Sequence, residues 1–280
     1  MYVGFRLSRR PVRAHDLADI QGATPAIELR IDWVGVSQLR QPLMVLDRSH
    51  SKQETVAVLM LAVDLGASQR GAHLSRFLDI LAEADNELTT RTAGRLLDEI
   101  KQRLSASAAR AVAAFPYFVE KRAPVTGARG LLDIASTFTF TDRGAGVEFV
   151  LEVTVPVTTL CPCSREVSDY GAHNQRCDVT IGIRTSADGD SEESIVWIED
   201  LIELVEANAS APIYPALKRP DERFVTMQAY DNPAFVEDVV RGVAAGLAAD
   251  PRVTDFCVEA SSDESIHNHR AFARIGSSLV

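Results

Sequence analysis

The segment 161–176 brings together side chains that can take part in chemistry. Cys161 and Cys163 are separated by one residue, and His173 follows further along the same segment. Few of its residues are aliphatic, although it comes directly after the apolar run 149–155, so it is poorly suited to a protein core. Thiolates and neutral imidazoles are preferred ligands of Zn²⁺. We therefore expect a metal or an activated sulfur at a strand end, and an enzyme site rather than a scaffold.

Two kinds of metal site are compatible with this segment. A structural zinc site would use four ligands, Cys161, Cys163, His173 and Cys177. Their spacing is a poor match to the usual zinc knuckles, in which about two to four residues separate paired cysteines. A catalytic site needs only three protein ligands, because one position stays open for water. We favour the catalytic arrangement, with Cys161, His173 and a carboxylate as ligands.

The charged segment 217–223 is a candidate source of that carboxylate. On its own, such a segment is most often a solvated turn. Pro220 restricts the backbone beside Glu222, whose carboxylate could act as an oxygen ligand. Lys218 and Arg219 could meet phosphate groups through charge-assisted hydrogen bonds.

Glu237 lies beside the apolar face of a helix that we expect over 232–249. A partly buried carboxylate needs hydrogen-bond partners, and the N1–H and exocyclic amine of guanine would offer two donors to its two oxygens. A solvated glutamate beside Asp238 is an equally good interpretation of the sequence.

Two histidines, His267 and His269, lie close together in the segment 265–269. In an extended chain they point to the same side, which suits metal binding or proton transfer near neutral pH. A weaker signal is the segment 71–76, which includes Arg76 and comes at the start of an expected helix, where backbone N–H groups favour anions.

Hydrophobic periodicity predicts the elements that must position these residues. In the first half it favours strands over 27–32, 53–65, 129–142 and 147–157, and helices over 73–84 and 87–106. In the second half it favours a strand over 179–184, helices over 197–208 and 232–249, and strands over 253–261 and 270–275. The last helix would begin with Asn232 as N-cap and Pro233 at its first position. The repeated order predicts two similar α+β halves in one compact unit, which meet near 160–178.

Composition and charge restrict the class of protein. With 280 residues and 46% hydrophobic content the chain can bury a full core. The net charge of −10 argues against a general nucleic-acid surface, and 4 cysteines are too few for a disulfide scaffold. The apolar runs are too short to cross a membrane, and the basic N-terminus lacks the apolar stretch of a secretory signal. We expect a cytoplasmic protein that binds neither nucleic acid nor membrane.

Several motifs together resemble those of the type IB GTP cyclohydrolases, the metal-promiscuous prokaryotic enzymes that catalyse the first step of folate synthesis. The likeness is carried by 157–166 (VTTLCPCSRE) running into 170–176 (YGAHNQR). Further segments fit in order: 71–77, 217–222 with 225–226, 229–233, 235–238 and 264–269. The resemblance extends from about residue 25 to residue 275.

The resemblance implies a tandem tunnelling fold of class α+β. Two ββααββ-like halves would form antiparallel sheets with helices on one face, and the chains would assemble into a barrel-like homotetramer. The halves would cover 25–160 and 161–280, after a flexible N-terminal arm over 1–24. The activity implied is conversion of GTP to 7,8-dihydroneopterin triphosphate with release of formate, the first step of tetrahydrofolate synthesis.

The resemblance also implies roles for single residues. The ligands of a divalent metal, Zn²⁺, Mn²⁺ or Fe²⁺, would be Cys161, His173 and Glu222, and the metal would lower the pKa of the water that attacks C8 of the guanine ring. The residues that bind or act on the substrate would be Glu237 at the guanine, His267 and His269 as proton donors, and Arg76, Lys218 or Arg219 at the triphosphate.

The chain departs from the family pattern in two places. It reads Met227-Gln228 where a more polar stretch with a glutamate is expected, and Arg270 follows His269 where an acidic residue is usual. Both changes could alter hydrogen bonds around the site.

Two other functions stay open. One is a nitrile reductase of the same fold with a cysteine nucleophile and NADPH, although its lysine-rich motif is not found; the other is a structural zinc protein without enzyme activity.

Overall fold

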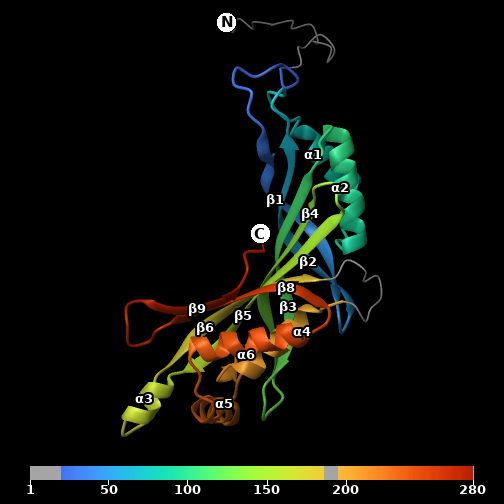
Figure 1. Cartoon of the computed structure of the whole chain (residues 1–280). Helices are drawn as coiled ribbons and strands as arrows, with labels where there is room; N and C mark the ends of the chain where they lie inside the picture. Colours follow the sequence, from blue (N-terminus) through green and yellow to red (C-terminus); the bar gives the residue numbers. More distant parts are fainter. Residues whose placement is uncertain (1–19, 186–194, 280) are drawn as a thin grey trace, which may run out of the picture.

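The structure, a computed structural model, describes residues 20–185 and 195–279 (Figure 1). In this part of the chain one antiparallel sheet has the strand order β1-β2-β3-β4-β5-β6-β8-β9, with the short β7 paired to β5. The strands are β1 (Ile31–Asp47), β2 (Ser51–Leu65), β3 (Ala109–Arg122), β4 (Arg129–Asp142), β5 (Val147–Leu160), β6 (Asn174–Thr185), β7 (Ala211–Pro212), β8 (Val253–Asp263) and β9 (Arg270–Gly276). The helices are α1 (Ser75–Glu83), α2 (Thr90–Leu104), α3 (Pro162–Val167), α4 (Ile198–Asn208), α5 (Arg219–Asp231) and α6 (Val236–Ala249).

The order of elements repeats once along the chain. Two strands, two helices and two strands make the first set, β1 to β4, and the second set begins with β5 and ends with β9. The helix α2 packs on β2, β3 and β4, whereas α4 packs on β5 and α6 packs on β8 and β9 (Figure 1). The expected α+β class, with an antiparallel sheet and helices on one face, is confirmed. The barrel-like assembly and the division between residues 160 and 161 stay predictions, and residues 1–19 of the expected arm lie outside the described part.

Alternation along the strands builds the helix-facing side of the sheet. In β3 the buried positions include Ala111, Ala113 and Phe115, which point to one face because successive side chains of a strand alternate. The helices complete the layer with buried side chains such as Leu97 of α2 and Val243 of α6. One core cluster includes all five of these residues, so the two sets of elements share a continuous interior.

The expected strand over 27–32 is wrong in its position. The sheet begins at Ile31, which pairs with Leu65, the last residue of β2. The residues before Ile31 therefore have no facing strand, and Ile27 and Leu29 are exposed. Alternation alone could not reveal this, because a strand also needs a neighbour for its backbone groups.

Periodicity along the sequence did not predict four elements, β3, β7, α3 and α5. The buried positions at the start of β3 are alanines, which give a weak hydrophobic period. The segment 217–223, interpreted as a turn, begins α5 instead.

The helix expected from Asn232 begins at Val236, after the N-cap Phe235. Asn232 ends α5 as its C-cap, and the Ala234 N–H between the two helices donates to Leu160 O at 3.1 Å. Within the described residues, no helix combines the length and the apolar character that a membrane span requires.

Candidate active site

Cys161 and His173 lie at the ends of two paired strands. The last pair of the β5–β6 ladder is Leu160 with Asn174, and the two candidate ligands are the next residue on either side. The Cys161 N–H donates to His173 O at 3.1 Å, so one more backbone hydrogen bond joins them beyond the ladder. The sheet register therefore brings together two residues that the sequence places at opposite ends of a polar loop.

Ser164 strengthens this connection from within α3. Cys161 is the N-cap of α3, and its Sγ accepts a hydrogen bond from the Ser164 N–H at 3.4 Å. The Ser164 hydroxyl donates to Cys161 O at 3.2 Å and accepts from the His173 N–H at 3.1 Å. One serine thus holds the backbone of both candidate ligands, a role that its position in a polar loop does not predict.

The imidazole of His173 has two neighbours on its Nδ1 side. Gln175 Oε1 is 2.9 Å from Nδ1, and Ser265 Oγ is 3.5 Å from the same atom. Ser265 belongs to the loop between β8 and β9, which therefore lies against the β5–β6 connection.

The two histidines of that loop are neighbours in space. The rings of His267 and His269 stack with their centroids 5.0 Å apart and an interplanar angle of 15°. Both residues are exposed, and the His267 N–H donates to Glu264 O at 3.4 Å. Because Ser265 contacts His173, the loop that carries this accessible imidazole pair lies at the same end of the sheet as the candidate ligands.

Helix α5 packs against the same strand end. Ala229 contacts a small buried cluster with Leu160, and Val225 packs on it. Glu222 lies three residues before Val225 and therefore on the same face of α5. The Glu222 side chain itself is exposed.

Asp221 explains why α5 begins where it does. Its buried carboxylate accepts from the N–H groups of Val125 and Thr126 at 2.9 and 2.8 Å, from the Thr126 hydroxyl at 2.6 Å, and from the Lys218 N–H at 2.9 Å. Burial raises the pKa of this carboxyl, but the hydrogen bonds from Thr126, Lys218 and Val125 outweigh it and hold the pKa well below the usual range. Asp221 thereby fixes the β3–β4 turn on α5 and orients the turn of helix that carries Glu222.

Glu237 stands in the first turn of α6 and is exposed. The backbone bond from Ala234 to Leu160 holds the start of α6 beside the end of β5. The structure therefore places Glu237 at the same end of the sheet as Cys161.

The candidate cations lie in two different places. Lys218 and Arg219 are exposed at the start of α5. Arg76 lies in α1, which packs on α2 and is distant from α3 (Figure 1). Its guanidinium donates to Arg103 O at 2.7 Å. In a single chain Arg76 does not join the residues around Cys161.

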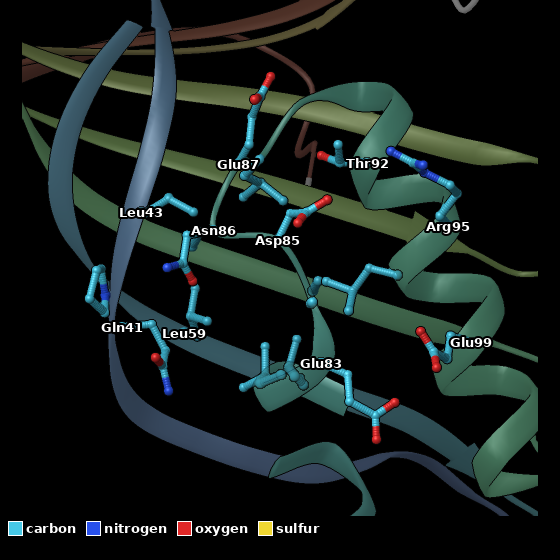
Figure 2. A pocket seen from close by; sticks show the side chains of 18 of the residues that line it. Gln41, Leu43, Leu59, Glu83, Asp85, Asn86, Glu87, Thr92, Arg95 and Glu99 are labelled. Carbon is cyan, nitrogen blue, oxygen red and sulfur yellow. The ribbon is translucent and has the colours of Figure 1, made fainter. Parts of the chain in front are cut away.

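A cavity of about 240 Å³ also lies in the first set of elements, between α2 and the strands β1, β2 and β3 (Figure 2). Leu59 and Leu61 line its apolar side, and the charged residues Glu83 and Arg95 are among those at its edge. None of the site residues predicted from the sequence lines this cavity.

Comparison with known proteins decides between the open interpretations. Residues 17–273 match the model of a family described as Type I GTP cyclohydrolase folE2. The chain belongs to this family. The GTP cyclohydrolase FolE2 of Magnetococcus marinus is 47% identical over 259 residues, which cover 92% of this chain and 95% of the relative. That of Methylococcus capsulatus is 49% identical over 257 residues, which cover 92% and 93% of the two chains. The prediction of a GTP cyclohydrolase enzyme is confirmed.

Solved urate oxidases share the fold of this GTP cyclohydrolase family member. A highly active mutant of the Bacillus sp. TB-90 urate oxidase gives a TM-score of 0.54 at 9% identity, and the match covers 89% of this chain and 100% of the oxidase. A hyperthermostable mutant of the same oxidase gives a TM-score of 0.51 at 9% identity, with coverage of 89% and 99%. At such low identity the likeness shows the fold alone.

The donor set of this cyclohydrolase fits a divalent metal in its chemistry. The candidate donors, from Cys161, His173 and Glu222, are a soft thiolate, a borderline imidazole and a hard carboxylate, a mixed set that suits Zn²⁺ and related ions. Cys161 and His173 are already joined through their backbones, and Glu222 lies on the helix face that packs beside them. In the described part of a single chain, however, no three His, Cys, Asp or Glu side chains converge closely enough to hold a metal ion.

The structure contradicts the structural zinc site that would use Cys161, Cys163, His173 and Cys177 as ligands. Cys177 is fully buried within β6 as a member of the main core, and burial together with the nearby Asp178 raises the pKa of its thiol to about 12. Cys163 is exposed on α3. Because Cys177 packs in the apolar interior while Cys161 caps a surface helix, the proposed four-ligand set is not assembled.

The departure at Arg270 has a structural consequence. Its guanidinium pairs with Asp263 at 2.7 Å and with Asp178 at 3.2 Å, at the base of the loop that carries the two histidines. Arg270 therefore lies where a substitution could alter hydrogen bonds near the two histidines, as expected from the sequence.

Proposed function

We propose that this protein is a type IB GTP cyclohydrolase. It opens the imidazole ring of the guanine of GTP by hydrolysis, releases formate and lets the product rearrange to 7,8-dihydroneopterin triphosphate, the first step of tetrahydrofolate synthesis in the cytoplasm. The observation that carries the proposal is the family match over residues 17–273, which includes every residue that we place in the site.

The metal would be held by Cys161, His173 and Glu222. When bound, a divalent metal such as Zn²⁺, Mn²⁺ or Fe²⁺ supplies the Lewis acidity that lowers the pKa of a water toward about 7. The chain contributes the orientation of the donors: the backbone bond from Cys161 to His173 holds two of them, and the Asp221 hydrogen bonds hold the helix turn that carries the third.

Glu237 would recognise the guanine. Its two carboxylate oxygens can accept from N1–H and from the exocyclic amine, a pattern that adenine cannot offer. An exposed position at the start of α6, beside the end of β5, leaves this carboxylate open to a ligand.

His267 and His269 would transfer protons. Either ring can donate to the departing ring nitrogen or to the ribose oxygen, a contribution typically worth ~10²–10⁴ in rate. Their exposure leaves both rings accessible to substrate, and the contact of Ser265 with His173 keeps their loop beside the candidate ligands.

The triphosphate would meet Lys218 and Arg219 at the start of α5. Arg76 would serve an active site shared with a neighbouring chain of a homotetramer. A shared site is supported by the separation of α1, which contains Arg76, from α3, which Cys161 caps (Figure 1). It is also supported by the incomplete convergence of the three donors within the described part of one chain.

The direct test is an assay of the chelator-stripped protein with GTP and added Mn²⁺ or Zn²⁺. We expect metal-dependent formation of formate together with the fluorescence of oxidised neopterin. Formate without a pterin would restrict the proposal to ring opening, and neither product with any of the metals would refute it.

The carboxylate ligand is tested in the same assay. We expect Glu222→Ala to lose both metal occupancy and turnover while Asp231→Ala, at the other end of the same helix, keeps both. Unchanged occupancy and turnover of Glu222→Ala would remove Glu222 from the ligand set.

A further inference from the structure

Gln175 is in position to determine which nitrogen of His173 is free to bind a metal. Its Oε1 lies 2.9 Å from His173 Nδ1, closer than Ser265 Oγ at 3.5 Å. An amide oxygen only accepts hydrogen bonds, so in this arrangement Nδ1 carries the proton and donates it. The lone pair is then on Nε2, the nitrogen on the other side of the ring.

Two other hydrogen bonds of His173 involve its main chain, whereas the contact with Gln175 acts on the imidazole ring itself. Cys161 and Ser164 hold the main chain of His173, through its carbonyl and its N–H. Neither contact restrains rotation of the imidazole. Gln175 is the second residue of β6, two positions further along, and side chains at a spacing of two lie on the same side of a strand.

The Gln175 backbone is itself anchored. Gln175 pairs with Thr159, a buried residue of β5, in the sheet register. Its side chain is half-buried, which restricts the rotamers that it can adopt. The amide therefore comes from a rigid strand, while the other neighbour of Nδ1, Ser265, comes from an exposed loop.

We infer that Gln175 is a positioning residue, which selects the Nδ1–H tautomer of His173 and orients Nε2 toward the divalent metal. The inference rests on the proposed function, because it needs His173 to be a ligand. Partners of metal-binding histidines typically change metal affinity by about 10–100-fold when they are removed.

Two measurements on the metal-free and metal-titrated full chain test the inference. Long-range ¹H–¹⁵N correlation spectra of histidine-labelled apo-protein, with His173 assigned by its loss in His173→Ala, report which ring nitrogen is protonated. Competition of the protein with a chromophoric chelator for Zn²⁺ at fixed pH reports the affinity. The variants are Gln175→Ala, Gln175→Glu and the matched control Asn174→Ala, an exposed neighbour in the same strand.

We expect wild type and Gln175→Glu to show the Nδ1–H tautomer and tight Zn²⁺ binding, because a carboxylate accepts the same proton. Gln175→Ala should lose the tautomer preference and bind Zn²⁺ about 10–100-fold more weakly, while Asn174→Ala should match wild type. Wild-type behaviour of Gln175→Ala in both measurements, or equal weakening in Asn174→Ala, would overturn the inference. Protonation of Nε2 in wild type would also overturn it.

Cys161→Ala separates this inference from the proposed site. Loss of Zn²⁺ binding in Cys161→Ala with no effect of Gln175→Ala would refute the role of Gln175 and leave the ligand set standing. Wild-type Zn²⁺ affinity in Cys161→Ala would refute the ligand set, and the inference would fall with it.

Discussion

The connection between β1 and β2 and the connection between β5 and β6 occupy the same place in the two repeats of the fold, yet they use their residues differently. The first is a short turn over residues 48–50, in which the buried Asp47 carboxylate accepts from the N–H groups of Ser49 and His50 at 2.8 and 2.7 Å. Arg48 in this turn pairs with Asp200 of α4 at 2.8 Å. The polar side chains of the first turn therefore serve the fold.

The second connection, residues 161–173, is longer and contains α3. Its hydrogen bonds hold backbone atoms of Cys161 and His173 and leave the imidazole Nε2 without an assigned protein partner among the described residues. The two connections occupy equivalent places in the fold, but only the longer one contains the candidate ligands Cys161 and His173. The longer link between β5 and β6 carries the candidate donors, and the β5–β6 ladder keeps the two ends of that link together.

The largest expected difference between the two connections concerns Cys161. Cys161→Ala should lower kcat by about 10³-fold or more, because loss of a proposed metal ligand would remove several kcal/mol of transition-state stabilisation. Cys163→Ala, two residues further on and exposed, should stay within about 2-fold of wild type. Steady-state kinetics with metal analysis of each purified variant checks this. Equal losses of kcat in Cys161→Ala and Cys163→Ala would contradict the proposal that Cys161, and not Cys163, is a metal ligand.

The second expected difference concerns the histidines. His267→Ala or His269→Ala should reduce kcat by ~10²–10⁴-fold at unchanged metal content, because the proposed proton transfer would be lost and the proposed metal ligands would be kept. His50→Ala, in the β1–β2 turn, is the matched control and should retain wild-type kcat. If the metal content of either loop variant fell together with its kcat, the loop histidines would be part of the metal site.

Asp221 allows a prediction about stability. Asp221→Asn should lower the melting temperature by several degrees. Both carboxylate oxygens of Asp221 accept hydrogen bonds, whereas the amide nitrogen that replaces one of them can only donate and would face N–H or O–H donors. The pKa of Asp221 is lower in the folded than in the unfolded protein, so its contribution is present above about pH 4 and declines as the pH falls through the folded value. Melting curves from pH 7 down to pH 3 should therefore show a difference that shrinks only at the acidic end. Asp231→Asn is the control at the exposed end of α5, and an equal loss there would refute the anchoring role.

The smallest expected effect concerns the buried thiol of Cys177. Its pKa of about 12 in the folded protein exceeds the unfolded value of about 8.5, so the unfolded state loses its proton first as the pH rises. Between these values the thiol lowers the free energy of unfolding by up to about 1.4 kcal/mol per pH unit. Urea denaturation at pH 7 and pH 10 should show a smaller alkaline loss for Cys177→Ala than for wild type. An identical alkaline loss in the two proteins would mean that the thiol is not buried as described.

The sequence predicted most of the strands and helices, because strong alternation marks strands such as β4 and β5 and helical periodicity marks α6. It failed where the pattern is weak or where long-range contacts decide. The strand β3 is rich in alanine at its start, and α5 begins at a segment that resembles a solvated turn. Asp221, which stabilises that start, receives hydrogen bonds from Val125 and Thr126, residues 96 and 95 positions away.

For the candidate site, the sequence predicted residue types better than geometry. Cys161, His173 and the histidine pair are unusual in their surroundings and could be selected from spacing and polarity alone. Glu222 and Glu237 could not be distinguished from surface glutamates, and both are exposed in the single chain. Nothing local in the sequence marks Ser164 or Gln175, since a serine in a polar loop and a glutamine in a strand are common.

The sequence by itself determined the chemistry that is available: thiol and imidazole groups in a polar connection, and carboxylates further along the chain. Only the tertiary structure decided which of these groups meet. The β5–β6 register joins Cys161 to His173, the β8–β9 loop brings Ser265 to the same ring, and the core removes Cys177 from the site. The physical reason is that side-chain chemistry belongs to each residue, whereas hydrogen-bond partners and burial depend on segments distant in the chain.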